Sequence, residues 1–408
     1  MVLLIFEAEN YKVILMKALL FILFISMFLS LGAQIKKDPY RQVDKTIAKI
    51  PDSLTATTDE IAGFINQNFV SESDKVRAVF MWVAGNISYD VEALKGLQRI
   101  RKDTIQTIDI LKSRKGVCEH YAVLFAEIAN KSGLKSYVVS GYTKQSAGVD
   151  SIGHAWCATL VDSAWYLFDP TWGAGGVMNG KYIKNLNTKY FRINPAVMIK
   201  DHMPFDPMWQ MLSYTISNSE FTLGLSGSIG EKNFFSFADT LALTEKQSEI
   251  ERITSEERRV AGNQLTNPII KGYDNYLKER ISVYYSNIEV AEHNAIVDKY
   301  NSAVELTRNC VSKYNEFVSF RNNQFRPAKT DDEIREMIML PLRLQNEAYK
   351  LVSGLSAKDK RLNNQIKQMN KELEDVGEAI NEQKKFVEEY LAASKIKRPA
   401  MFYKVKKK

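Results

Sequence analysis

The sequence predicts an α+β domain followed by a mainly α-helical, coiled-coil-like region. In the first half of the chain, segments with helical spacing of apolar residues precede short strands, two of them joined by a tight turn at Asp162-Ser163. From about residue 240 onward, long polar and charged segments with few glycines predict long helices instead. A chain of 408 residues is also longer than a domain built around one hydrophobic core usually is. Two or three folded units are therefore expected.

The composition is that of an ordinary globular protein, with 45% hydrophobic and 25% charged residues. The net charge of +7 has a local origin, because the last 14 residues contain seven Lys or Arg and no acid, which leaves 48 bases against 48 acids elsewhere. This balance argues against a nucleic-acid-binding protein. The basic tail, residues 399–408, is expected either to be a solvated terminus or to make weak contact with an anionic membrane surface.

Residues 1–33 have the pattern of a secretory signal peptide. Lys17 precedes an apolar run, residues 18–31, that ends in the small residues Gly32-Ala33, so cleavage near Ala33 is expected. Met16 directly before Lys17 suggests that residues 1–15 are an upstream extension. We therefore expect a secreted or periplasmic protein.

A retained membrane anchor is the competing interpretation, because residues 13–31 come close to the ~20 apolar residues that span a bilayer. Three cysteines are few for an exported protein of this length, so disulfides are not expected to hold it together. Cys157 and Cys310 are expected to be buried thiols.

Helices and then strands are predicted after a partly ordered lead-in, residues 34–57. The apolar spacing and capping residues predict helices over 58–69, 72–86, 107–113 and 118–131. Strands are predicted over 136–142, 155–161 and 164–169. Small and apolar residues on one side of the 118–131 helix would let it approach a sheet closely.

The predicted hairpin allows a geometric check. A two-residue loop sets Val161 opposite Ala164 and, further back, Trp156 opposite Asp169. His154 shares the face of Trp156 because strands alternate with period two. His154 and Asp169 are then diagonal neighbours about 7–8 Å apart at the backbone. The same alternation turns Cys157 to the opposite face, so we expect Cys157 to be structural and Cys118 to be the chemical thiol.

A cysteine at a helix start, with a histidine and an aspartate on paired strands, predicts nucleophilic catalysis. The helix N-terminus and a neighbouring imidazole both favour the thiolate of Cys118, and a carboxylate can hold that imidazole in the useful tautomer. The N–H of Cys118 is also available to an oxyanion. Cys118, His154 and Asp169 are the predicted acyl-transfer triad; an inactive relic of the same fold is the alternative.

Three motifs surround the predicted triad: Gly116-Val117-Cys118-Glu119-His120-Tyr121-Ala122, His154-Ala155-Trp156 and Trp165-Tyr166-Leu167-Phe168-Asp169-Pro170-Thr171-Trp172. Together they resemble the transglutaminase-like superfamily, most closely its microbial and kyphoscoliosis-peptidase-type branch. The segment His202-Met203-Pro204-Phe205-Asp206-Pro207 is similar to one that often follows the core in exported bacterial members. The resemblance covers about residues 58–215 and does not extend to the helical region.

The resemblance implies a papain-like core in which a helix carrying Cys118 packs on an antiparallel sheet. It implies Cys118 as the nucleophile, His154 as the base that later becomes the acid, and Asp169 as the orienting carboxylate. Family members form a thioester and pass the acyl group to an amine or to water. The sequence departs from the family at Cys157, where relatives often carry a polar residue such as asparagine.

Other residues have weaker claims on the site. Trp156 and Trp172 are candidates for the substrate cleft, although aromatics that flank a sheet are more often core. Trp82 and Gln106 are weak candidates for the side chain that completes the oxyanion hole. His202 has no cluster of acids or histidines at ligand spacing in the sequence, so no metal site is expected. The enzyme interpretation needs no metal or organic cofactor.

The helical region is predicted over residues 226–398, after a catalytic domain at 58–225. Two heptad patterns, at 297–318 and 362–380, flank a shorter helical segment and suggest an antiparallel coiled-coil hairpin. The two helices of such a hairpin usually just bury their apolar faces against each other. The alternative is that they form an arm that binds a protein partner.

Taken together, these features predict an exported cysteine peptidase or amidase that acts on a protein or peptide. A protein-glutamine transamidase is the runner-up among enzymes. A catalytically inactive scaffold that acts through its coiled coil is the alternative from another class.

Overall fold

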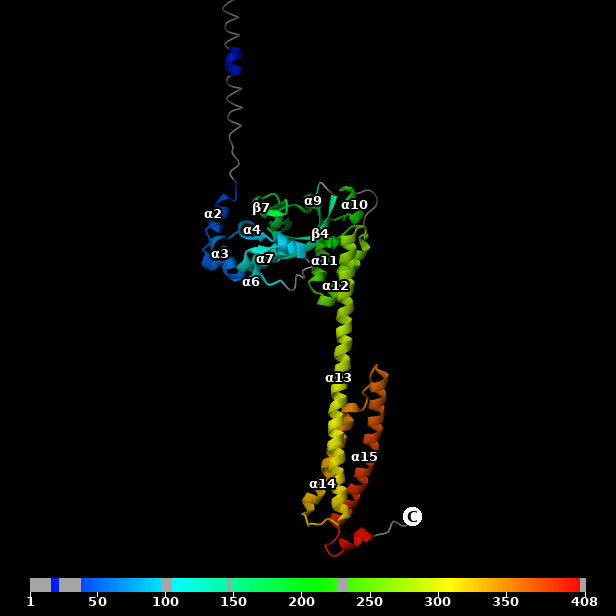
Figure 1. The fold of residues 1–408 in the computed structure, drawn as a ribbon. Helices are drawn as coiled ribbons and strands as arrows, with labels where there is room; N and C mark the ends of the chain where they lie inside the picture. Colours follow the sequence, from blue (N-terminus) through cyan, green and yellow to red (C-terminus); the bar gives the residue numbers. More distant parts are fainter. Residues whose placement is uncertain (1–15, 22–37, 97–104, 146–147, 226–232, 404–408) are drawn as a thin grey trace, which may run out of the picture. The chain divides into compact units, whose positions relative to one another are not determined.

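The computed structural model describes residues 16–21, 38–96, 105–145, 148–225 and 233–403. The predicted signal peptide lies outside the described residues except for residues 16–21, which are helical. The chain divides into two compact units, Met1–Lys278 and Glu279–Lys408 (Figure 1). Among the described residues, no helix combines the length and the apolarity needed to cross a bilayer.

The N-terminal helices of the first unit are α2 (Arg41–Ile47), α3 (Thr58–Asn68) and α4 (Glu72–Asn86). A capping box at Thr57 starts α3, and the Ser71 hydroxyl caps α4, as the sequence predicts. The described part of the predicted lead-in, residues 38–57, includes α2, which joins the core because Asp44 forms an ion pair of 2.7 Å with the buried Arg77.

The central helix is α7 (Cys118–Lys131), which begins at the residue the sequence predicts. It follows α6 (Thr107–Ser113) and the short β2 (Lys115–Gly116), which pairs in parallel with β1 (Ser88–Tyr89). One side of α7 packs on the sheet and the other contacts α3 and α4. The Phe125 ring stacks on Phe168 of the sheet with centroids 5.5 Å apart. The main hydrophobic core of the unit therefore surrounds α7.

The four-stranded antiparallel sheet has the order β5-β4-β3-β8. The strands are β3 (Lys135–Gln145), β4 (Gly148–Val161), β5 (Ala164–Phe168) and β8 (His202–Pro204). The hairpin register is confirmed: Val161 pairs with Ala164 and Cys157 with Phe168. Asp162 and Ser163 adopt φ of 53° and 64°, as a tight two-residue hairpin requires.

Two features of the sheet differ from the sequence-based prediction. First, β4 begins at Gly148, so His154 lies inside a strand rather than at its start. Second, β8 adds an unpredicted edge strand beside β3. Close approach makes glycine necessary at position 141, since a Cβ there would lie 2.1 Å from the Met203 carbonyl oxygen and 2.5 Å from the Trp156 ring.

Smaller elements complete the first unit. They are η1 (Asp52–Leu54), α5 (Val91–Gly96), α8 (Pro170–Ala174), the hairpin of β6 (Gly175–Met178) and β7 (Lys181–Lys184), α9 (Pro195–Met198), η3 (Pro207–Gln210), α10 (Asn218–Leu223), α11 (Phe237–Thr244) and α12 (Glu249–Gly262). Arg259 of α12 holds Asp206 in a two-bond ion pair, and Phe237 of α11 packs against Trp209. These contacts explain why this unit extends to Lys278, beyond the domain end at 225 that the sequence suggests.

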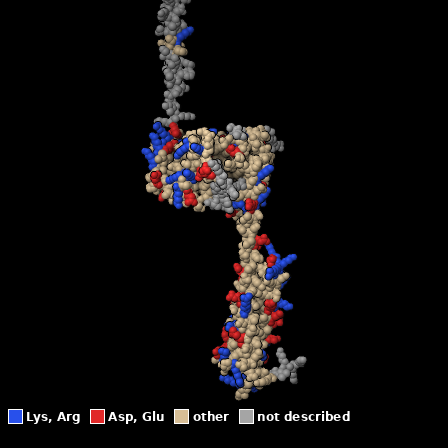
Figure 2. All heavy atoms as spheres, viewed as in Figure 1, with Lys and Arg blue, Asp and Glu red and all other residues tan. Residues whose placement is uncertain are grey.

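The second unit contains the helical region. Asn267 caps α13 (Pro268–Asn322), as predicted, and the part of α13 after Lys278 packs with α14 (Asp331–Val352) and α15 (Lys360–Ala392). Heptad residues such as Tyr314, Val318 and Ile380 do face a shared buried cluster, but α14 contributes Ile334 and Ile338 to it. The two-helix hairpin that the heptads suggest is therefore an assembly of three helices. Acidic and basic side chains are interspersed along this unit in Figure 2.

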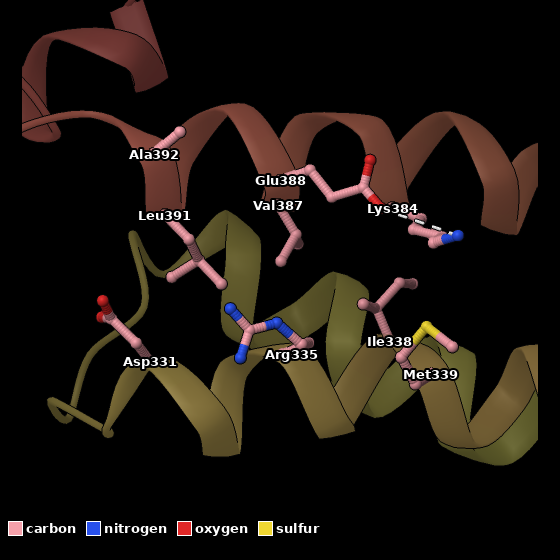
Figure 3. A pocket seen from close by; sticks show the side chains of 9 residues that line it. All are labelled: Asp331, Arg335, Ile338, Met339, Lys384, Val387, Glu388, Leu391 and Ala392. Atoms are coloured by element: carbon pink, nitrogen blue, oxygen red, sulfur yellow. Dashed lines mark ion pairs between the residues drawn. The ribbon is translucent and has the colours of Figure 1, made fainter.

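A groove of about 330 Å³ lies between α14 and α15 (Figure 3). Its floor is apolar, with Ile338, Val387 and Leu391, and charged residues such as Arg335 and Glu388 form its rim. Cys310, the thiol of this unit, is buried and donates to the Pro341 carbonyl oxygen at 3.3 Å. The groove and the thiol are thus separate features of the helical unit.

Candidate active site

The local backbone fixes Cys118 at the first turn of α7. Val117, the residue before the helix, has an extended conformation, and its N–H donates to Nδ1 of His120 at 3.2 Å. A Cβ on residue 116 would lie 2.5 Å from the His120 Cβ, so glycine is needed there for the turn into the helix. His120 therefore stabilises the start of α7, two residues after Cys118.

The Cys118 sulfur lies against the strand that carries His154. Its thiol is 3.3 Å from a carboxylate oxygen of Glu119 and 4.0 Å from the carbonyl oxygen of Gly153, and the backbone N–H of Ala155 is directed at the sulfur. Gly153 and Ala155 flank His154 in β4, so the sulfur lies against the backbone of the strand that carries the imidazole.

The thiol is held in its protonated form. Burial, with Cys118 only 4% exposed, and the neighbouring Glu119 carboxylate raise the pKa of Cys118 well above its ordinary value. The sequence-based expectation was the opposite, because it counted the helix N-terminus and the imidazole but not burial or Glu119. Cys118 is therefore a neutral thiol packed against the strand that carries His154.

His154 and Asp169 are joined as the hairpin register predicts. Nε2 of His154 lies 2.8 Å from Oδ2 of Asp169, and both side chains are buried. An ionised carboxylate only accepts, so the neutral imidazole carries its proton on Nε2. Nδ1 is then the unprotonated ring nitrogen, able to accept a proton.

Asp169 is the most densely bonded group of the site. It is the N-cap of α8, where Oδ1 accepts the N–H groups of Thr171 and Trp172 at 2.8 and 3.0 Å. Oδ2 accepts from His154 and also from His202, at 3.2 Å. Burial opposes ionisation of Asp169, but the two imidazoles outweigh it and hold the pKa of this carboxyl well below its ordinary value.

His202 is the site residue that the sequence analysis missed. The inference that His202 has no acidic or histidine neighbours is wrong: Nε2 faces Asp169, and Nδ1 lies 2.7 Å from Oδ1 of Asp201. The contact depends on β8 pairing with β3, where Thr143 is opposite His202. Such a three-residue edge strand gives almost no periodic signal in the sequence.

The ligand atoms of His154, Asp169 and His202 lie within 4.8 Å of one another, a spacing that a metal ion could use. The same atoms are already paired as hydrogen-bond donors and acceptors. A metal ion would have to displace both hydrogen bonds. The donor set therefore fits a proton network better than a metal centre.

Of the four weaker candidates, two lie beside the imidazoles and two do not. Trp156 and Trp172 pack around the imidazoles, with ring centroids 5.1 and 4.6 Å from that of His202. Trp156 is fully buried, so it supports the site from the core, whereas Trp172 is half-buried. Trp82 is buried with its indole N–H unpaired, and Gln106 is exposed before α6. No hydrogen bond joins either residue to the triad in the described part of the chain.

Tyr89 is a second neighbour of the thiol that the sequence analysis did not single out. It lies on β1 opposite Gly116, two residues before Cys118. Burial raises the pKa of Tyr89 far above its ordinary value, and the charges of Cys118, Glu119 and Asp169 add to the effect. Its phenol therefore remains protonated beside the thiol.

Comparison with known proteins agrees with this arrangement. The family model of the transglutaminase-like superfamily matches residues 56–170, which include Cys118, His154 and Asp169. Residues 56–170 form a transglutaminase-like domain.

The relatives of the transglutaminase-like domain include two curated proteins. The kyphoscoliosis peptidase of Mus musculus is 30% identical over 190 residues, which cover 45% of this chain and 28% of the relative. That of Homo sapiens is 32% identical over 171 residues, which cover 40% of this chain and 25% of the relative. The match spans about a quarter of the length of these relatives. A solved structure described as a TGase has 19% identity and a TM-score of 0.26, and covers 59% of this chain and 56% of its own.

Proposed function

We propose that this protein is an exported thiol acyl-transfer enzyme that hydrolyses a peptide or carboxamide bond in a protein or peptide. The observation that carries the proposal is that the thiol lies against the strand whose imidazole is bonded to a buried carboxylate. The Cys118 sulfur lies against the backbone on both sides of His154, and His154 donates to the buried Asp169 at 2.8 Å. The peptidase relatives favour the hydrolytic reaction over transamidation.

In the acylation step, His154 acts as the general base. Binding of a substrate carbonyl displaces the Glu119 carboxylate from the thiol, and Nδ1 of His154 accepts the thiol proton as the sulfur attacks the carbonyl carbon. Asp169 stabilises the imidazolium that forms. The N–H of Cys118, at the N-terminus of α7, donates to the developing oxyanion.

The intermediate collapses when the C–N bond breaks and the imidazolium gives its proton to the leaving amine. This leaves a thioester on Cys118. His154, neutral again, then removes a proton from water, which attacks the thioester carbonyl and releases the carboxylic acid. The thiol regains its proton, and the site is restored.

The test is alkylation of Cys118 by iodoacetamide, followed by peptide mass spectrometry, in the full mature chain. We expect His154→Ala to slow alkylation at pH 7.5 by roughly tenfold or more, because a positioned base contributes about 10²–10⁴-fold in full catalysis. His293→Ala is the matched control, since His293 is exposed in the helical unit. Equal rates in all three proteins would remove the enzyme interpretation and favour the scaffold.

Export is tested separately by N-terminal sequencing of protein recovered outside the producing cell. The proposed signal peptide predicts a mature chain that begins close after Ala33. A chain that retains the apolar run and stays with the membrane fraction would support the anchor instead.

A further inference from the structure

His202 has an unusual position for a histidine. It is 1% exposed, it lies on the edge strand β8, and both of its ring nitrogens face carboxylate oxygens. Nε2 is 3.2 Å from Asp169 and Nδ1 is 2.7 Å from Asp201. The catalytic scheme above uses the first carboxylate but leaves His202 and Asp201 without a role.

Two carboxylate partners define the protonation state of His202. A neutral imidazole has one donor and one acceptor nitrogen, whereas an imidazolium donates from both. Burial alone would lower the pKa of His202, but the hydrogen bonds to Asp169 and Asp201 outweigh it and raise this pKa above its ordinary value. The geometry and the electrostatics therefore both favour a cation.

The other groups around His202 are compatible with a cation. Tyr190 donates to the second oxygen of Asp201 at 3.0 Å, and Lys189 helps to keep the pKa of Asp201 low. From β4, the His154 ring lies 5.5 Å away between centroids, and it donates to the same Asp169 oxygen. The neighbouring Trp156 and Trp172 rings carry no charge. The positive charge of His202 thus balances the negative charge of Asp169.

We propose that His202 is a positioning residue of the Cys118 site, a buried imidazolium that holds the Asp169 carboxylate toward His154 and balances its negative charge. This inference rests on the proposed function, because it assigns His202 a role in that same site. His202 touches neither the thiol nor the imidazole proton that is transferred. It acts through Asp169.

Two consequences follow for the reaction. Oδ1 of Asp169 is fixed by the N–H groups of α8 and Oδ2 by His202, so the carboxylate cannot rotate away from His154. In addition, burial, the Glu119 carboxylate and the Asp169 charge all raise the pKa of the Cys118 thiol, and the positive charge on His202 offsets the contribution of Asp169. Without that charge, the thiol would ionise only at a higher pH.

The first experiment measures the pH profile of Cys118 alkylation in the full chain. His202→Gln keeps a donor that can reach Asp169 but removes the charge, so we expect a profile shifted by about one unit to higher pH. His202→Phe removes both the charge and the donor, and we expect a further loss of rate of roughly tenfold at the optimum.

Arg259→Gln is the matched control. It also removes a cation from a buried carboxylate, Asp206, and should destabilise the same unit without moving the pH profile. If His202→Gln and His202→Phe change the profile no more than Arg259→Gln does, the positioning role is overturned.

The second experiment reads the charge of His202 directly. The chain has only four histidines, so ¹⁵N-histidine NMR of the wild type and His202→Gln can assign its signals. The proposal predicts that both ring nitrogens of His202 stay protonated at pH 7.5; a neutral ring at that pH overturns it. Alkylation independent of His154 would instead overturn the proposed function, whereas dependence on His154 with no response to His202 substitution would overturn only this inference.

Discussion

Asp169→Asn is the substitution with the most calculable consequences. Asp169 faces donors on both sides: two N–H groups of α8 on Oδ1, and two imidazoles on Oδ2. Asparagine has one oxygen and one NH₂ group. Whichever way its amide is turned, the NH₂ group faces a pair of donors, so one side of the network is broken in every orientation.

The free-energy cost follows from the burial of the site. Asp169 is fully buried, and removal of its charge leaves the His202 imidazolium short of one of its two partners. Removing one partner of a buried pair costs about 3–5 kcal/mol. If the amide instead turns its NH₂ group to α8, the lost cap costs about 1 kcal/mol in addition to the lost charge.

The effect on reactivity has a separate cause. With its oxygen on α8, the asparagine NH₂ donates to Nε2 of His154, which moves the ring proton to Nδ1 and removes the base. The equivalent change in a Ser-His-Asp triad costs roughly 10⁴-fold in turnover. Alkylation of Cys118 at pH 7.5 should therefore fall to the level of His154→Ala.

The stability assay is urea unfolding followed by tryptophan fluorescence. All five tryptophans lie in the first unit, so the signal reports on that unit: Trp82, Trp156, Trp165, Trp172 and Trp209. Asp206→Asn is the control, because Asp206 is also a buried cap with a cationic partner. It should destabilise the unit but leave alkylation unchanged. The reasoning would be refuted if the free energy of unfolding of Asp169→Asn lay within about 1 kcal/mol of the wild-type value and Cys118 were alkylated at the normal rate.

Three further predictions concern the same unit. Glu119→Gln should move the alkylation profile of Cys118 to lower pH, because the carboxylate raises the pKa of the thiol; an unchanged profile would exclude this electrostatic effect. The low pKa of Asp169 in the folded state predicts a contribution to stability that is present above about pH 3.9, the ordinary value, and is lost as pH falls further. The difference in free energy of unfolding between wild type and Asp169→Asn, measured with urea, should therefore shrink between pH 5 and pH 2. Phe168→Ala should lower the free energy of unfolding, measured by tryptophan fluorescence, by about 3–5 kcal/mol, since the buried Phe168 ring stacks on Phe125. A smaller loss would indicate that neighbouring side chains move into the cavity.

The sequence predicts the local elements of the site well. The α7 helix starts at Cys118, and the turn at Asp162-Ser163 sets the register that brings His154 to Asp169, because both depend on nearest neighbours in the chain. The Asp169-Pro170 pair is also a local helix-start signal, with a capping residue followed by proline, and it could have been used to predict α8.

The sequence does not predict what depends on distant contacts. His202 reaches Asp169 only because β8 pairs with β3, and the heptad pattern does not reveal that α14 packs into the same buried cluster as α13 and α15. The thiol pKa was also predicted in the wrong direction, because burial is a property of the whole fold. Local pattern predicts where Cys118, His154 and Asp169 lie in their elements, and tertiary packing decides their electrostatics.

The central claim is that Cys118 forms a thioester with the help of His154. The most direct measurement is acylation by p-nitrophenyl acetate, with the modified residue located by mass spectrometry in wild type, His154→Ala and His293→Ala. The account predicts a hydroxylamine-labile acetyl group on Cys118 that forms at the same rate in wild type and His293→Ala and much more slowly in His154→Ala. Equal acylation in all three proteins, or acylation only at other residues, would contradict it.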